Sequence, residues 1–306
     1  MYTTRYVFLQ PDFPVLFFNS WPYVHHQYAD DAISMSLCDK YDNCKALVTF
    51  CIKDHTLYAP YRAPFGGIEF DENLSDDDIS VLLKEIDTLT KQHNLLSIRL
   101  ALPPLCYNEK KIIRLKSLLE KHGYEIAITD INYHIPISDK EFEHIISRSE
   151  RGELIQCRKM SFRCVLEQHP DLDKVYALIS ENRKFRGIPL NITSVQFKNC
   201  FFKFPGQYNQ FNVYNEQELI ATASVVQVNQ DALYYFLPAY HEKYKTFSPG
   251  IMALEKIYEY AQAHQYKIFD LGIATDKGIP NEGLMQFKRK LGGIESEKWI
   301  MEKKVK

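Results

Sequence analysis

The fold is decided by the stretch Tyr234-Tyr235-Phe236-Leu237, then Ser248-Pro249-Gly250, then Phe269-Asp270-Leu271-Gly272. Its pattern predicts a strand, a turn that opens an amphipathic helix over 251–264, and a second strand. A proline costs no hydrogen bond at a helix start, a serine can cap the helix, and a glycine lets another group approach the backbone. Because the first amides of a helix have no partner within it, this turn is a place for a phosphate. An ordinary strand-to-helix turn is the alternative.

The first half of the chain carries a similar order of elements. Residues 46–52 and 55–60 have the pattern of strands, Pro64-Phe65-Gly66-Gly67 forms a loop, and 79–93 and 96–102 follow as helix and strand. In the second half the corresponding strands are 211–214, 220–226 and 232–237. We therefore interpret the chain as one α/β module that occurs twice, the alternative being coincidence among alternating α/β elements.

Several further elements are expected outside the two modules. Helices are predicted over 110–122, 140–151, 172–182 and 195–200, and a strand over 126–137. The polar helix 140–151 would join the halves, with its charges on a solvated face. We accordingly expect two domains, 1–150 and 151–306.

Composition argues against several classes of protein, although local basic grooves remain possible. Among 306 residues, 37 basic and 39 acidic side chains give a formal net charge of −2, which is not the basic footprint of a nucleic-acid binder. No apolar run is long enough to cross a membrane, and the first residues lack the pattern of a signal peptide. The seven cysteines form no C-x-x-C pair and have no histidines at metal spacing. We expect a cytoplasmic protein without a metal.

Polar residues in the second half are candidates for chemistry. Asp270 ends a strand, where it could orient an amine or a catalytic water, or bond nearby loop amides. Asn281 to Lys288 has the pattern of a short helix that carries Glu282. Lys288 could stabilise an oxyanion, although a surface lysine beside Arg289 and Lys290 has the same pattern.

Basic residues near the turn could meet a phosphate. Lys245 lies just upstream of Ser248, and the forked side chains of Arg183 and Arg186 suit carboxylates or phosphates. Solvated loop charges, or a basic helix C-terminus favoured by the helix dipole, are the alternatives. In the first half, acidic residues follow Gly67 and would repel a phosphate; these are Asp71, Glu72, Asp76, Asp77 and Asp78. We therefore expect donor binding in the second half, with the first structural or lining a substrate groove.

Taken together, these residues resemble the FemAB-like branch of the GNAT acyltransferase superfamily, whose members are tandem GNAT folds. The resemblance rests on motifs in order: Arg186-Gly187-Ile188-Pro189-Leu190, Tyr244-Lys245-Thr246-Phe247-Ser248-Pro249-Gly250, Phe269-Asp270-Leu271-Gly272 and Gly283 to Gly292. It covers about 155–295 well and the first half mainly through Pro64-Phe65-Gly66-Gly67. It implies an α/β (α+β) fold of two duplicated GNAT-like modules, each a mixed central sheet flanked by helices.

The resemblance also implies roles for individual residues. Acyl-CoA would place its pyrophosphate at the turn from Phe247 to Ile251 and its pantetheine arm along the strand 233–238. The implied donor residues are Tyr235, Phe236, Leu237, Lys245, Phe247, Ser248, Gly250 and Ile251. The acceptor amine would enter between the modules, near Arg183, Arg186, Tyr235, Asp270 and Glu282, and Lys288 matches a lysine that steadies the oxyanion.

The sequence departs from the family pattern at the donor turn. The glycine-rich loop of ordinary acetyltransferases is reduced to Lys245-Thr246-Phe247-Ser248-Pro249-Gly250, and the tyrosine that protonates a leaving thiolate is missing. Our hypothesis is N-acyl transfer from acyl-CoA to a primary amine of a small molecule or peptide, with Asp270, Glu282 or a water as base. The alternatives are aminoacyl-tRNA-dependent transfer, disfavoured by the net charge and the absence of a basic arm, and a non-catalytic GNAT-like binding protein. Oligomeric state is not indicated.

Overall fold

The computed structural model describes residues 2–28 and 32–305. The chain forms two compact units that no single boundary separates. The first unit contains residues 1–132, 275–280 and 296–306, and the second contains 133–274 and 281–295. Strands β7 (Glu125–Pro136) and β15 (Ile294–Lys304) contribute residues to both units. The expected division at residue 150 is therefore simpler than the observed one.

The sheet of the first unit has the neighbour order β1-β2-β3-β4-β6-β15, with β5 on β3. Its other strands are β1 (Thr3–Arg5), β2 (Ala32–Cys38), β3 (Cys44–Lys53), β4 (Thr56–Ala59), β5 (Glu69–Phe70) and β6 (Ser97–Ala101). Its helices are α1 (Trp21–Tyr28), α2 (Asp76–Gln92) and α3 (Glu109–Lys121), with short 3₁₀ turns η1 (Phe17–Asn19) and η3 (Leu105–Tyr107). The hairpin β13 (Thr275–Asp276) and β14 (Ile279–Pro280) also belongs here.

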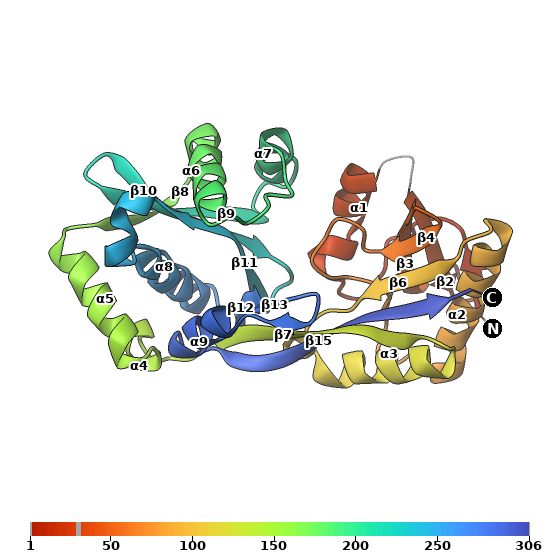
Figure 1. Ribbon diagram of the computed structural model, residues 1–306. Helices are drawn as coiled ribbons and strands as arrows, with labels where there is room; N and C mark the ends of the chain where they lie inside the picture. Colours follow the sequence, from red (N-terminus) through yellow and green to blue (C-terminus); the bar gives the residue numbers. More distant parts are fainter. Residues whose placement is uncertain (1, 29–31, 306) are drawn as a thin grey trace. The chain divides into compact units, whose positions relative to one another are not determined.

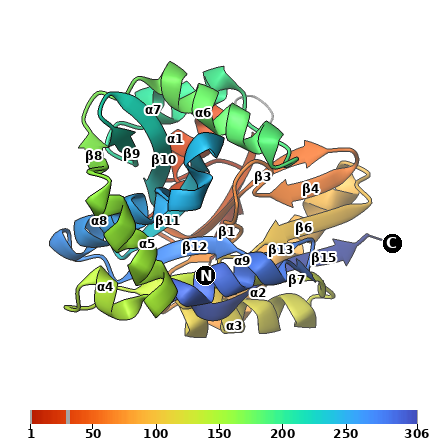
Figure 2. The ribbon, with the colours of Figure 1, turned by 60° about the vertical axis from the view of Figure 1, so that its left-hand side comes forward.

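The sheet of the second unit continues from β7 in the order β12-β11-β10-β9-β8. Its strands are β8 (Arg163–Glu167), β9 (Tyr208–Asn215), β10 (Glu218–Gln227), β11 (Ala232–Tyr240) and β12 (Ile268–Ile273). Its helices are α4 (Phe142–Ile145), α5 (Arg148–Lys159), α6 (Leu172–Phe185), α7 (Ser194–Lys203), α8 (Gly250–Ala263) and α9 (Glu282–Lys290), with the 3₁₀ turn η4 (Glu242–Phe247). Helices α6 and α7 cover one face of this sheet and α8 covers the other (Figures 1 and 2).

The duplicated module predicted from the sequence is confirmed. In the first unit β3 pairs antiparallel with β4, α2 follows, and β6 returns parallel to β4. In the second unit β10 pairs antiparallel with β11, α8 follows, and β12 returns parallel to β11. In the second copy α8 begins soon after β11, whose next neighbour β12 is parallel to it, and this is where α/β sheets bind ligands; in the first copy β5 lies between β4 and α2.

The two central helices form because each carries an apolar stripe at helical spacing. Helix α8 buries Ile251, Leu254, Ile257, Tyr258 and Ala261 against its sheet. Helix α2 buries a matching stripe of Ile79, Leu82, Leu83, Ile86 and Leu89. Burial of each large apolar side chain contributes roughly 1.5–3 kcal/mol, so the helices hold the turns in front of them in place.

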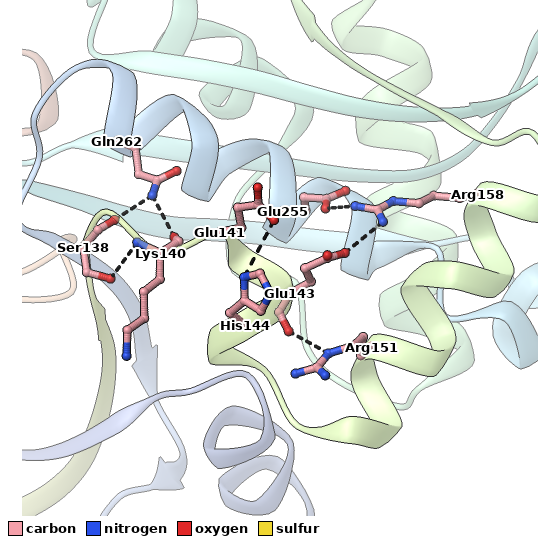
Figure 3. A network of polar contacts seen from close by, with 9 residues as sticks. All are labelled: Ser138, Lys140, Glu141, Glu143, His144, Arg151, Arg158, Glu255 and Gln262. Carbon is pink, nitrogen blue, oxygen red and sulfur yellow. Dashed lines mark hydrogen bonds and ion pairs between the residues drawn. The ribbon is translucent and has the colours of Figure 1, made fainter.

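The predicted single helix over 140–151 is wrong, because the structure forms α4 and α5 there. Ile146 is extended, and the side chain of Ser147 accepts the Glu150 N–H to start α5 afresh. Arg158 of α5 then bonds both Glu143 of α4 and Glu255 of α8, as Figure 3 shows. A serine that satisfies a helix start explains the break. The charges are also not all solvated, because Glu150 is buried.

Within the described ranges 2–28 and 32–305, none of the helices combines the length and the apolar character needed to cross a lipid bilayer.

Candidate functional site

Strands β11 and β12 of the second unit separate part-way along β11. They pair in parallel at Ala232↔Ile268, Leu233↔Phe269 and Tyr234↔Asp270, while β11 continues to Tyr240. Among the described residues, no strand pairs with 235–240 on the side where β12 would lie. The backbone groups along this edge are therefore open to a ligand that can bond like a strand.

A bulge interrupts β11 where the strands have separated. Phe236 pairs with Ser224 and Ala239 with Thr222, so Leu237 and Pro238 together lie opposite Ala223. Leu237 has a φ of 47°, and Pro238 has no N–H for the ladder. A bulge of this kind turns a peptide group out of the regular pattern, as bulges near binding sites commonly do. Leu237 was predicted to contact the donor, and the structure gives it an unusual backbone.

Helix α8 begins without a side-chain cap. Pro249, not Ser248, occupies the N-cap position, so the predicted cap by Ser248 is wrong, and the first turn has no acidic residue. The N–H groups of Ile251 and Met252 bond the carbonyls of Ser248 and Pro249. In the described part of the chain only the Gly250 N–H of this turn has no acceptor. A Cβ added at Gly250 meets no atom within 4 Å, so the space before it is open.

The 3₁₀ turn η4 is fixed to the unit by its own contacts. The Tyr244 hydroxyl donates to Glu218, and Phe162 packs edge-on against Tyr244 and Phe247. The Cys157 thiol donates to the carbonyl of Phe247 at 3.0 Å. The turn in front of α8 is thus held rigidly, which favours binding of a ligand in one position.

The cations upstream of α8 differ in how they are paired. Lys243 lies 3.4 Å from a Glu218 oxygen. Lys245 lies instead 5.8 Å from the centre of the Phe185 ring, at the end of α6, and among the described residues no carboxylate pairs with it. Lys245 is therefore the cation of η4 that is available to an anion.

The end of α6 adds two arginines. Burial and the neighbouring Arg186 lower the pKa of Arg183, and its Nε is buried with no hydrogen-bond partner among the described residues. Arg186 is exposed at the helix end, and Asn182 donates to the Tyr240 carbonyl at the end of β11. Arg183, Arg186 and Lys245 thus come from two elements that meet through Phe185, with no acidic partner in the residues described.

Asp270 and Lys288 come together at the end of β12. Asp270 is fully buried, and its Oδ1 accepts the Gly272 N–H at 2.8 Å. Lys288 of α9 is 6% exposed and donates from Nζ to the carbonyls of Gly272 at 2.7 Å and Ile273 at 2.8 Å. Burial lowers the pKa of Lys288 to about 8, and the charge of Asp270 opposes that fall. The alternative of a surface lysine is wrong for Lys288.

Glu282 lies apart from that pair. It is exposed in the first turn of α9, and in the described residues no hydrogen bond or ion pair joins it to Asp270 or Lys288. Tyr235 and Phe236 point into the unit, where Tyr235 packs edge-on against Phe269 and Phe236 against Tyr208. Tyr235 and Phe236 therefore offer a ligand mainly their backbone groups.

Sequence reasoning missed three residues of this region. Tyr234 pairs with Asp270 and lies within 3.5 Å of a Cβ built at Gly272, so it closes the inner end of the opening. Asn182 fixes the end of β11, and Gln210 bonds the residue opposite the bulge. Of these three residues only Tyr234 could have been found from the sequence, because it is the first residue of the strand motif 234–237.

The matching loop of the first unit is filled. A Cβ at Gly66 would lie 2.6 Å from Asn19 Oδ1, and the Gly66 N–H bonds the Ala101 carbonyl. Gly66 and Gly67 do not open a helix, because α2 begins at Asp76 with Ser75 as its cap. The space at Gly66 is therefore filled, and the choice between a structural role and a substrate groove for the first half stays a prediction.

Among residues 2–28 and 32–305, one group of side chains could hold a metal ion. Glu141, Glu143 and His144 hold ligand atoms within 4.8 Å of one another (Figure 3). Glu143 already bonds Arg158, and Glu141 lies 3.7 Å from His144. Because the group is mostly exposed and its charges already have partners, it does not indicate a metal.

The second unit combines a diverging parallel pair, a bulged strand and a helix start beside them, which is the arrangement of a GNAT fold, and the first unit repeats its order of elements. Residues 147–289 match the family model described as an acetyltransferase (GNAT) domain. This match covers a little under half of the chain and says what that region is similar to.

Solved structures share this fold at low sequence identity. FemX has a TM-score of 0.73 and 13% identity, covering 94% of this chain and 92% of that one. L-PGS from Bacillus licheniformis has a TM-score of 0.62 and 14% identity, covering 90% and 85%. A tandem GNAT protein from the clavulanic acid biosynthesis pathway has a TM-score of 0.53 and 9% identity, covering 89% and 82%. No curated protein sequence matches the chain.

Proposed function

We propose that the chain is an N-acyltransferase that moves an acyl group from acyl-CoA to a primary amine. The observation that carries the proposal is the opening of β11 from β12 directly before the uncapped start of α8. A pantetheine arm carries amides that can bond a strand edge, and a pyrophosphate suits a helix start beside a free lysine. Lys245 and the Gly250 N–H are placed in the same turn.

The reaction requires groups for one addition and one elimination. The neutral amine attacks the thioester carbonyl, the carbon–sulfur bond breaks, and the amine proton leaves while the thiolate of CoA takes up a proton. Backbone N–H groups at the β11 bulge and the Lys288 ammonium would stabilise the tetrahedral oxyanion. Two Lys288 protons bond carbonyls, so one N–H remains for the substrate.

The base remains a choice between Asp270, Glu282 and a water. Asp270 is fully buried and already bonds Gly272, which favours a positioning role in which it holds the Gly272 turn and supports the charge on Lys288. Glu282 is exposed and can meet an incoming amine only from solvent. A water is the base that this arrangement supports best.

Calorimetry with acyl-CoA tests the donor. We expect acetyl-CoA or a longer acyl-CoA to bind, and Gly250→Trp to abolish binding because its ring fills the open space before α8. Gly152→Trp is a matched control, since a Cβ at Gly152 also meets nothing within 4 Å. If acetyl-CoA and longer acyl-CoAs all fail to bind at millimolar concentration, the proposal is wrong.

Aminoacyl-tRNA is the second candidate donor, favoured by the three cations without acidic partners, Arg183, Arg186 and Lys245. FemX and L-PGS share the fold, which leaves this donor open. Binding of tRNA that falls steeply with salt, and that Arg183→Ala and Lys245→Ala both weaken, would favour it over acyl-CoA. Binding of either donor without transfer to any amine would favour a non-catalytic protein.

A further inference from the structure

Four polar side chains lie buried together on strands β9 and β10 of the second unit. Gln210, Asn212, Thr222 and Ser224 are each at most 2% exposed. Side chains alternate along a strand, so Gln210 shares the face of Tyr208, which packs on Phe201 of α7. A sheet face under helices is ordinarily apolar, because each buried polar group must find a partner.

Gln210 is the centre of this group. Its Oε1 accepts the Ser224 hydroxyl at 2.7 Å, and its Nε2 lies 3.2 Å from the Ala223 carbonyl and 2.5 Å from the Thr222 hydroxyl oxygen. Thr222 in turn donates to Asn212 at 2.6 Å. One side chain therefore holds three consecutive residues of β10.

Those three residues are the ones that face the bulge of β11. Thr222 pairs with Ala239 and Ser224 with Phe236, which leaves Ala223 opposite both Leu237 and Pro238. Pro238 has no N–H to donate to β10, and the Ala223 carbonyl accepts the amide of Gln210. The polar group thus lies behind the one irregular point of β11.

We propose that Gln210 is a positioning residue that fixes the β11 bulge and its register. Antiparallel strands can shift register, and a bulge survives only where neighbouring groups specify it. The Gln210 bonds to residues 222–224 are made in the register that has Ala223 opposite the bulge. That register presents the backbone of Leu237 at the open edge, so the catalytic consequence rests on the proposed acyl transfer.

Hydrogen exchange followed by mass spectrometry tests the proposal on the protein alone. Gln210→Met keeps the length of the side chain but removes both polar groups. Peptides covering 232–240 should exchange about tenfold faster or more, as expected when a buried bond is lost, while α8 peptides keep their protection. Ser36→Ala is the control, because Ser36 is a buried serine of the first unit that bonds Leu9 and Val7.

Unchanged exchange over 232–240 in folded Gln210→Met would overturn the proposal, as would an equal increase in Ser36→Ala. If Gln210→Met does not fold, Ser224→Ala removes one bond to Gln210 and should give a smaller increase confined to the same peptides; no increase counts against the proposal. In a transfer assay, Gln210→Met should lower kcat about tenfold or more with an unchanged KM for acyl-CoA. Failure of acyl-CoA to bind the wild type would remove the proposed function without affecting the exchange result.

Discussion

The two helix starts that follow the repeated strands, α2 and α8, differ in what occupies them. At α2 the side chain of Ser75 accepts the Asp78 N–H, and three aspartates fill the first turn. At α8 a proline occupies the N-cap, no acidic residue follows, and the space before Gly250 is open. The positive end of α2 is satisfied by side chains of the chain itself, while that of α8 has neither a side-chain cap nor an acidic residue in its first turn.

The strands beside these helices differ in the same way. All of β4, from Thr56 to Ala59, pairs with β6. Only residues 232–234 of β11 pair with β12. At the end of β6 the Ala101 carbonyl accepts the Gly66 N–H, whereas at the end of β12 the carbonyls hold Lys288. One copy of the module has thus closed its opening with its own backbone, and the other keeps it open with a cation at the end.

Removing the cation should have the largest effect. Lys288→Met is expected to lower kcat for acyl transfer about 10²–10³-fold, the cost of losing one oxyanion donor, with little change in acyl-CoA affinity. Steady-state kinetics and calorimetry measure the two quantities. Lys290→Met, which alters a part-exposed lysine of the same helix, should be nearly neutral. A kcat within threefold of wild type for Lys288→Met would remove Lys288 from the mechanism.

Giving α8 an acidic start like that of α2 should weaken donor binding next most. Gly250→Asp places a carboxylate at the proposed phosphate position and should lower acyl-CoA affinity about 10- to 100-fold by repulsion. The same change should raise the unfolding free energy by about 0.3–1 kcal/mol, through the helix dipole. Calorimetry and urea denaturation give both values. Gly250→Asn separates size from charge, and equal losses for both variants would contradict the electrostatic explanation.

Lys288 should also give the second unit a distinct pH dependence. Its pKa is lowered from 10.5 to about 8 in the folded state. Below pH 8 the lysine is charged in both states, and between the two values the unfolded chain binds more protons, so stability rises with pH. From pH 7.5 to 9.5 this contribution is about 2 kcal/mol. When urea denaturation is repeated across this pH range, the unfolding free energy of wild type should rise about 2 kcal/mol more than that of Lys288→Met. If the two free energies change with pH in parallel, the pKa of Lys288 is unshifted.

The smallest effect is expected at the capped helix. Ser75→Ala removes the acceptor for the Asp78 N–H and should lower the unfolding free energy by about 1 kcal/mol. Acyl-CoA affinity should remain as in wild type, because α2 belongs to the closed copy. Thermal unfolding and calorimetry check this. A marked loss of donor binding would mean that the first unit takes part in the donor site.

The sequence predicted most of the repeated elements because their apolar residues follow helix or strand periods, as in α8 and α2. It failed where a single residue changed the local geometry. Ser147 starts a new helix within the range 140–151, where the charge pattern predicts one continuous helix. Pro249 occupies the N-cap position that was expected for Ser248. Strand β15 was not predicted, because the charged residues Glu295, Glu297 and Lys298 interrupt the apolar pattern around its buried Trp299 and Met301.

For the site, motif order indicated the strand end and the helix start. The pairing of Asp270 with Tyr234, the tethering of Lys288 and the Gln210 group depend on contacts between strands, which a single sequence does not reveal. The roles of Glu282, Arg183 and Arg186 remain predictions.

Strand β15 has a consequence for how the chain acquires its structure during synthesis. Trp299 and Met301 belong to the core of the first unit, and Arg99 on β6 bonds Glu302, which lies 203 positions further along the chain. A ribosome therefore releases the sheet partner of β6 only after the whole second unit has been made. Until then the edge of β6 that pairs with β15 is uncovered, which exposes the first unit to aggregation. Folding of that unit also depends on contacts between residues far apart in the sequence, which form slowly.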